Sequence, residues 1–239
     1  MIYLITGASG NIGSYLSRDL CHNNDVILHF NRSGIKAEEV FNDILSLKGR
    51  PYLFSADLAT EDGCDNLIDF FSSKFSRLDL LINSAGGIIK PTNLSSMSWS
   101  FIQDQFALNA ISSMYLSTRL LPYLEKSNNG LVINISSAPL TPASLSVPVY
   151  SSAKSSISTF TQYLSKYAAP KVRVNAIEPY LISSCEKERN GEWSFMRNKL
   201  ASETPLKIEG HPQDIATIVK MMIANKYLTG SIVKVTGGI

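Results

Sequence analysis

The chain has 239 residues, of which 44% are hydrophobic and 18% charged, enough to build a large buried core. Its formal net charge is only +2 and no long basic run occurs, which argues against nucleic acid or a membrane surface as a partner. The three cysteines and three histidines are scattered, so we expect no metal site and a reducing, cytoplasmic location rather than a disulfide-linked secreted protein. The apolar N-terminal run is too short for a signal peptide, and no segment reaches the length of a membrane-spanning helix.

Short, nearly continuous apolar runs alternate with helical patterns along the chain. The apolar runs predict strands at 2–6, 25–30, 51–55, 79–83, 131–136, 172–177 and 231–235. Helices are expected near 12–22, 36–47, 62–74, 98–126, 149–168 and 212–225. Regular alternation of this kind predicts one α/β domain over residues 1–239, with a doubly wound parallel sheet of about seven strands and helices on both faces. The irregular stretch around 180–211 is expected to act as a lid over a substrate.

The first predicted strand runs into the segment TGASGNIG, which leads to a helix. Glycines here permit a tight turn and let backbone N–H groups approach a pyrophosphate at the helix N-terminus. An ordinary glycine-rich turn is the alternative, but three glycines within seven positions favour a dinucleotide site. The candidate cofactor contacts in this loop are Gly7, Ser9, Gly10, Asn11, Ile12 and Gly13.

The second predicted strand ends in HFNRS, residues 29–33, which contains no acidic residue. An acidic side chain at this point normally binds the adenosine-ribose hydroxyls of NAD. Asn31, Arg32 and Ser33 instead supply a cation and two hydrogen-bonding side chains, which suit a 2′-phosphate. The segment therefore favours NADPH over NADH, the alternative being an arginine on a solvated turn.

Two segments place a lysine four residues after a tyrosine, YSSAK at 150–154 and YAAPK at 167–171. On a regular helix the two side chains share a face, and the lysine charge lowers the pKa of the tyrosine. Such a phenol can protonate the alkoxide that forms when hydride reduces a carbonyl. Pro170 disrupts the final turn of the second segment, so Tyr150 and Lys154 are the expected pair.

Together these segments resemble the short-chain dehydrogenases/reductases. The resemblance rests on TGASGNIG, NSAG (83–86), NISS (134–137), YSSAK and VRVNAIEP (172–179), which stand in the family's order, and it extends to the closing YLTGSIVKVTGG. It implies a Rossmann fold and an NAD(P)-dependent oxidoreductase that reduces a small-molecule carbonyl, of ketone or 3-oxoacyl type, to an alcohol. The chain is generally similar to 3-oxoacyl carrier-protein reductases, and HFNRS is similar to the NADPH-binding stretch of pteridine reductases.

The resemblance implies a catalytic set of Asn109, Ser137, Tyr150 and Lys154. Ser137, thirteen residues before Tyr150, would donate a hydrogen bond to the substrate carbonyl. Its neighbour Ser136 is the alternative, but side chains alternate along a strand, so it should point elsewhere. Asn109 would bond the helix backbone and hold a water that joins Lys154 to solvent, although an asparagine in mid-helix can simply face solvent.

Further cofactor contacts are implied beyond the glycine loop. Asp57 would bond the adenine amino group with Leu58 beside the ring, whereas an acidic residue after a strand can equally cap the next helix. NSAG would lie against the cofactor ribose, and the segment after the sixth strand against the nicotinamide. The remaining implied contacts are Asn83, Ala85, Gly86, Tyr150, Lys154, Pro179, Ile182 and Ser184.

The chain departs from the family after the sixth strand, where Tyr180 follows Pro179 in place of the usual glycine. We expect Tyr180 to shape the substrate pocket, with packing in the core as the alternative. A catalytically silent dinucleotide-binding regulator or scaffold is the alternative function, against which the complete catalytic set argues. Relatives commonly form tetramers through the helices at 98–126 and 149–168 and the last strand, so a homotetramer or dimer is implied.

Overall fold

The computed structural model describes residues 1–90, 92, 94–138, 147–183 and 191–239. Seven parallel strands form one sheet in the order β3-β2-β1-β4-β5-β6-β7. The strands are β1 (Ile2–Ile5), β2 (Asp25–Phe30), β3 (Arg50–Ser55), β4 (Leu80–Asn83), β5 (Gly130–Ile135), β6 (Val172–Pro179) and β7 (Ile232–Val235). This confirms the predicted doubly wound Rossmann sheet. Because the strand order reverses between β1 and β4, a crevice is expected at their carboxyl ends.

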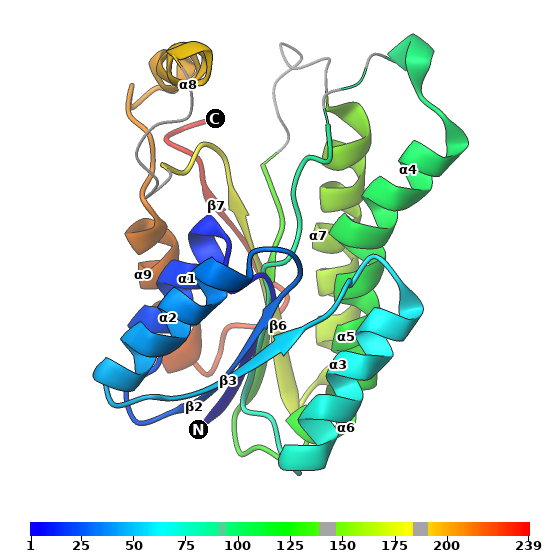
Figure 1. The fold of residues 1–239 in the computed structure, drawn as a ribbon, viewed down its shortest axis with the longest axis vertical. Coiled ribbons are helices and arrows are strands. Elements are labelled where there is room, and N and C mark those ends of the chain that lie inside the picture. The colour runs from blue at the N-terminus through cyan, green and yellow to red at the C-terminus, as the bar shows by residue number, and fades with distance from the viewer. Residues whose placement is uncertain (91, 93, 139–146, 184–190) are drawn as a thin grey trace.

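Helices cover both faces of the sheet, as predicted (Figure 1). One face carries α1 (Asn11–Asp19), α2 (Gly34–Ser46) and α9 (Pro212–Ala224). The other carries α3 (Glu61–Lys74), α4 (Trp99–Phe106), α5 (Ser112–Arg119), α6 (Leu121–Leu124) and α7 (Pro148–Ala168). In the part of the chain that the structure describes, no helix is both long and apolar enough to span a bilayer.

The strands are apolar on both faces because each face packs on its own helices. Ile5 belongs to the core under α1, α2 and α9, whereas its neighbour Leu4 belongs to the core under α3, α5 and α7. Both side chains are completely buried. Burying one such side chain contributes about 2 kcal/mol, so the two cores fix the sheet from which the site residues emerge.

The helix predicted over 98–126 is interrupted in the structure. A π-helical segment, η2 (Ala107–Ile111), separates α4 from α5, and Pro122 begins the short α6. The short 3-10 helix η1 (Leu94–Ser96) precedes α4. The predicted helix is therefore present from Trp99 to Arg119, but it contains a π-helical turn and is followed by the separate short helix α6. π-Helical turns are rare and frequently occur at functional sites, and this one contains Asn109.

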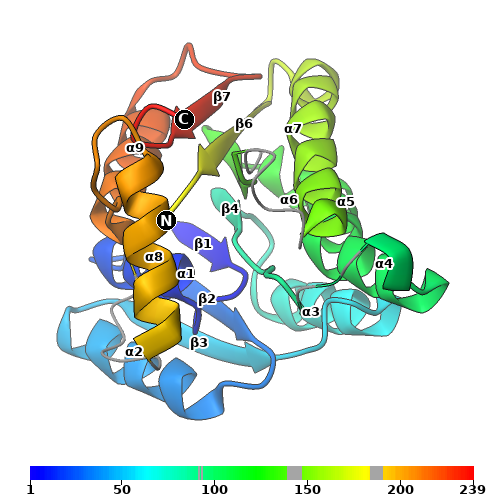
Figure 2. The ribbon, with the colours of Figure 1, turned by 90° about the horizontal axis from the view of Figure 1, so that it is seen from above.

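The stretch predicted to be irregular around 180–211 contains the helix α8 (Gly191–Glu203). This helix lies beyond the ends at which the strands finish, on the side of the sheet that carries α1 and α9 (Figure 1 and Figure 2). Apolar residues do not gather on one side of α8, which explains why hydrophobic periodicity missed it.

Candidate active site

A cleft of about 260 Å³ opens at the carboxyl ends of β5 and β6, beside the loops that follow β1 and β4. It is lined by Gly10, Asn11, Ile12, Gly13, Ser84, Gly86, Ile135, Ser136, Ser137, Tyr150, Lys154, Pro179, Tyr180 and Ile182. The fold thus brings the glycine loop together with the ends of three strands and the start of α7. Open α/β sheets bind ligands in this position.

The glycine loop fits the phosphates of a dinucleotide. Gly7 has a φ of +67°, and a Cβ there would lie 2.9 Å from the Cα of Ala85. A Cβ on Gly13 would lie 2.2 Å from the carbonyl oxygen of Gly7. α1 begins at Asn11 and has no acidic residue in its first turn, so its N-terminal N–H groups face the cleft without a competing carboxylate.

Thr6 joins the glycine loop to the loop after β4. Its Oγ1 accepts hydrogen bonds from the backbone N–H groups of Ser84 and Ala85, both at 3.0 Å. Ala85, a predicted cofactor contact, is buried and is not among the residues that line the cleft. Ser84, which the sequence interpretation did not single out, lines the cleft.

The side chain of Asn11 points toward the segment after β6. Its Nδ2 donates to the carbonyl oxygen of Ser183 at 2.7 Å. The sequence gives no sign of this bond, because the two residues are 172 positions apart. Pro179 and Ile182, which are predicted to contact the cofactor, line the cleft. Ser184, the third predicted contact in this segment, lies outside the described residues.

Tyr150 and Lys154 stand one turn apart near the start of α7, on the cleft. Lys154 is 4% exposed, and its Nζ donates to the carbonyl oxygen of Ile135 at 2.8 Å. Ser136 is buried and its Oγ donates to the main-chain oxygen of Lys154 at 2.7 Å, so it points away from Ser137, as strand alternation predicted. Ser137 Oγ donates to the main-chain oxygen of Ala138 at 3.2 Å, and it lies close enough to the Tyr150 phenol to lower its pKa.

Burial controls the ionisation of both residues. It raises the pKa of Tyr150, and the hydrogen bond from Ser137 only partly opposes this. It lowers the pKa of Lys154 to about 8. Lys154 is not among the groups that shift the pKa of Tyr150, so the expected lowering of this pKa by the lysine charge is not found in this structure.

Asn109 is completely buried, which excludes the solvent-facing alternative. Its Oδ1 accepts from the Gly87 N–H at 2.7 Å, and its Nδ2 donates to the carbonyl oxygens of Gly87 and Gln105, both at 3.0 Å. Gly86 lies between the two polar side chains, since a Cβ there would lie 2.7 Å from Asn109 Oδ1 and 3.0 Å from Lys154 Nζ. Asn109 thus fixes the loop after β4 beside Lys154.

The side chain of Asn83 points into the core, so the cofactor contact predicted for the NSAG segment would have to come from its main chain. Its Nδ2 donates to Asn134 Oδ1 at 2.8 Å and to Ser117 Oγ at 2.9 Å. Asn134 in turn donates to Thr161 Oγ1 at 2.9 Å. These buried bonds join β4 and β5 to the helices α5 and α7, which makes Asn83 a structural residue.

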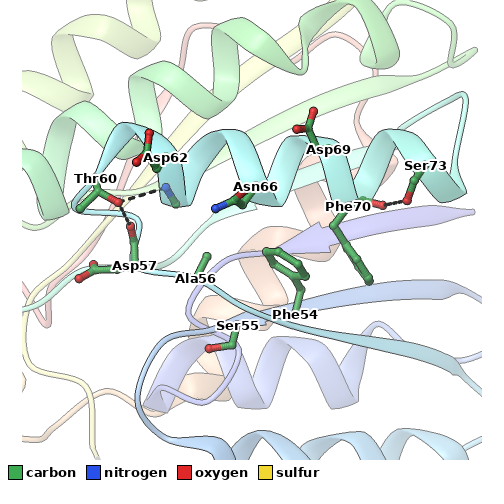
Figure 3. A pocket seen from close by; sticks show the side chains of 11 residues that line it. Phe54, Ser55, Ala56, Asp57, Thr60, Asp62, Asn66, Asp69, Phe70 and Ser73 are labelled. Carbon is green, nitrogen blue, oxygen red and sulfur yellow. Dashed lines mark hydrogen bonds between the residues drawn. The ribbon is translucent and has the colours of Figure 1, made fainter.

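At the other end of the crevice, residues 31–33 are exposed between β2 and α2. Asp57 is exposed after β3, and Thr60 rather than Asp57 caps α3, because Thr60 Oγ1 accepts from the Gly63 N–H (Figure 3). The capping alternative for Asp57 is therefore wrong. Leu58 is 3% exposed and packs in the core, so its side chain is not free to lie beside an adenine ring.

A second, shallow hollow of about 560 Å³ lies between β3 and α3 (Figure 3). Its aromatic wall is Phe54 and Phe70, whose stacked rings have centroids 4.5 Å apart. Asp57 lies at one end of it. The glycine loop and the start of α7 do not contribute to this hollow, so it is not part of the cleft.

Tyr180 lines the cleft and is only partly buried, which favours its predicted place in the pocket wall over the core-packing alternative. Burial raises the pKa of its phenol, and the nearby carboxylate of Glu203 adds to this effect. Among the described residues, no group of three histidine, cysteine or acidic side chains has the arrangement of a metal site.

Known proteins resemble this chain along its whole length. The family model described as short chain dehydrogenase matches residues 1–194. A 7alpha-hydroxysteroid dehydrogenase of Bacteroides fragilis is 28% identical, over 100% of this chain and 93% of its own length. A 3-oxoacyl-[acyl-carrier-protein] reductase of Synechocystis is 30% identical, over 99% of this chain and 96% of its own. The structure of L-sorbose reductase from Gluconobacter frateurii, complexed with NADPH and L-sorbose, has a TM-score of 0.89 at 23% identity, covering 99% of this chain and 95% of that one.

Proposed function

This chain belongs to the short-chain dehydrogenase family and is an NAD(P)-dependent oxidoreductase, and on that premise we propose that it uses NADPH to reduce a carbonyl to an alcohol. The observation that carries the proposal is the meeting of Ser137, Tyr150 and Lys154 in one cleft with the glycine loop. Tyr150 is the proton donor and Ser137 polarises the carbonyl. Lys154 binds the nicotinamide ribose of the cofactor and stabilises the ionised phenol of Tyr150.

Each step draws on a different property of the site. NADPH, when bound, supplies a hydride to the carbonyl carbon. Ser137 donates a hydrogen bond to the carbonyl oxygen, and the buried phenol of Tyr150 gives its proton to the oxygen as negative charge develops there. The Lys154 ammonium then stabilises the phenolate and helps to return a proton to it. Asn109 holds the loop after β4 beside this ammonium group.

The proposed nucleotide site runs from the glycine loop to residues 31–33. The N-terminal N–H groups of α1 receive the pyrophosphate, within the loop formed by Gly7, Ser9, Gly10, Ile12 and Gly13. Arg32, with Asn31 and Ser33, receives the 2′-phosphate, supported by the absence of an acidic residue in this exposed turn. Asp57 binds the adenine through its exposed carboxylate, and Lys154, Gly86, Pro179 and Ile182 lie against the nicotinamide half.

We propose that the substrate is a ketone or a 3-oxoacyl compound. The protein is proposed to be a single domain in which the segment 180–211 covers the bound substrate. Tyr180 lines the same cleft as Tyr150 and is proposed to contact the substrate. The relatives are named for activity on a hydroxysteroid, a 3-oxoacyl group and a sugar. What these compounds share is a carbonyl group or the corresponding alcohol, and this shared group supports the proposed substrate class.

A homotetramer or dimer is proposed for the assembled protein. Aromatic and aliphatic side chains are exposed on α4, η2 and α7: Trp99 (77%), Ile111 (55%), Tyr163 (73%) and Tyr167 (80%). Large exposed apolar side chains of this kind support a contact between copies. The buried free thiols of Cys21 and Cys64 support the proposed cytoplasmic location, since a reducing compartment keeps cysteines unpaired.

Cofactor consumption with a panel of carbonyl compounds tests the proposal. We expect NADPH oxidation with at least one ketone or 3-oxoacyl thioester, and a slower reaction with NADH. A protein that binds NADPH but oxidises it with none of them supports the alternative, a silent dinucleotide-binding scaffold. A protein that binds neither nucleotide contradicts both.

A further inference from the structure

His29 is a buried histidine that the proposed chemistry does not use. It lies near the end of β2, is 2% exposed, and contacts the glycine loop at Gly7. Its imidazole is hydrogen-bonded on both sides. Nδ1 accepts from the Gly7 N–H at 3.2 Å, and Nε2 lies 3.0 Å from the carbonyl oxygen of Ala56.

The partners fix the tautomer of the ring. Gly7 N–H is a donor, so Nδ1 must carry a lone pair, while the Ala56 carbonyl is an acceptor, so Nε2 must carry the hydrogen. A second proton on Nδ1 would face the Gly7 N–H. Burial accordingly lowers the pKa of His29 to about 4, although the Ala56 carbonyl and the Asp57 carboxylate act in the opposite direction. The ring is neutral at physiological pH.

Main-chain bonds reinforce the same junction. The carbonyl oxygen of His29 accepts from the Ala8 N–H at 2.8 Å, and the carbonyl oxygen of Phe30 accepts from the Ala56 N–H at 3.0 Å. Three segments are therefore joined at one residue: the glycine loop, the end of β2 and the end of β3. The first holds the phosphates in the proposed site, the second leads to Arg32, and the third leads to Asp57.

We infer that His29 is a positioning residue for the adenosine half of the nucleotide, setting the distance between the glycine loop and the Ala56–Asp57 segment. It acts through Gly7 and Ala56 and does not itself touch the nucleotide. A preorganised site loses affinity when its loop becomes free to move, because binding must then order the loop. This inference rests on the proposed nucleotide site.

Three variants separate the two side-chain bonds. His29→Leu removes both. His29→Asn keeps an acceptor near the position of Nδ1 and so keeps the Gly7 bond, whereas His29→Gln keeps a donor near the position of Nε2 and so keeps the Ala56 bond. His22→Asn is the matched control, because His22 is exposed and its ring meets only the carbonyl oxygen of Leu47 among the contacts described.

The test measures dissociation constants for the nucleotide that the wild type uses, for its adenosine half (2′,5′-ADP or ADP) and for nicotinamide mononucleotide. We expect His29→Leu to weaken the dinucleotide and the adenosine half by about tenfold each, the loss of one or two hydrogen bonds. Nicotinamide mononucleotide binding and kcat at saturating cofactor should stay near wild type, and Asn and Gln should each restore part of the affinity. A purely structural role would instead lower the active fraction and leave every dissociation constant unchanged.

Unchanged affinity for the adenosine half in His29→Leu overturns the inference while leaving the proposed function intact. Where His29→Leu fails to fold, unchanged affinity in both His29→Asn and His29→Gln overturns it. A wild-type protein that binds neither nucleotide overturns the inference and the proposed function together.

Discussion

Gly86 lies against Lys154 so closely that a Cβ at position 86 would come within 3.0 Å of the lysine Nζ. The same Cβ would lie 2.7 Å from Asn109 Oδ1, and Gly86 has a φ of +149°, which L side chains rarely adopt. The loop after β4 therefore shares one small volume with two residues of the proposed catalytic set.

Gly86→Ala should reduce kcat by at least about tenfold, because the methyl group displaces the Lys154 ammonium. Backbone strain should also lower the free energy of unfolding by about 1–3 kcal/mol. Gly87→Ala is the matched control, since nothing lies within 4 Å of its added Cβ, and it should keep most of its activity. Kinetics and thermal unfolding of both variants check this, and equal activities would contradict it.

The buried lysine predicts a pH dependence. Its pKa of about 8 is lowered by burial, so the ammonium form is present below that pH and is lost as pH rises through it. The Tyr150 phenol stays protonated over the same range, because burial raises its pKa. We expect kcat/KM for reduction to fall as pH increases through about 8. Lys154→Arg, which stays charged, should be less active and lack this step; a flat wild-type profile would contradict the assignment.

Arg32 tests the choice of cofactor. Arg32→Ala should raise the KM for NADPH by about tenfold or more, through loss of a charge-assisted bond to the 2′-phosphate, with little change in the KM for NADH. Arg18→Ala serves as control, because Arg18 pairs with the exposed Asp43 on α2. Equal effects of Arg32→Ala on both nucleotides would show that the side chain does not distinguish them.

The exposed aromatic residues of α7 test the proposed assembly. Tyr163 and Tyr167 are one turn apart, so replacing both by lysine should place two charges on the same side of the helix. Light scattering should find a dimer or tetramer for the wild type and a smaller species for the double variant. Ile35→Lys, at a residue 78% exposed on α2, should leave the mass unchanged. A monomeric wild type would contradict the proposal.

The sheet could be predicted because its information is local. Each strand is a short apolar run, and burial on both faces makes such runs nearly continuous, as Leu4 and Ile5 illustrate. The π-helical turn within the helix predicted over 98–126 could not be predicted in this way. It occurs at Asn109, whose side chain bonds to Gly87 from a distant loop.

In the candidate site too, the residues that follow from local sequence patterns could be predicted, and those that depend on distant partners could not. Tyr150, Lys154 and the glycine loop follow from spacing on one helix and one turn, and the structure brings them to one cleft. The inward direction of Asn83 depends on partners in β5 and two helices, which no local pattern reveals. The role of His29 could not be predicted for the same reason, since its ring bonds connect Gly7 after β1 with Ala56 after β3.

The measurement that tests the central claim most directly compares Tyr150→Phe with Tyr167→Phe, the two tyrosines that precede a lysine by four residues. NADPH binding is titrated first, and single-turnover reduction of a substrate found in the carbonyl panel is then followed. We predict that Tyr150→Phe binds NADPH like the wild type but loses turnover by about a thousandfold or more, as expected for removal of a proton donor. Tyr167→Phe should retain both. Substantial turnover by Tyr150→Phe would contradict the assignment of Tyr150 as the proton donor.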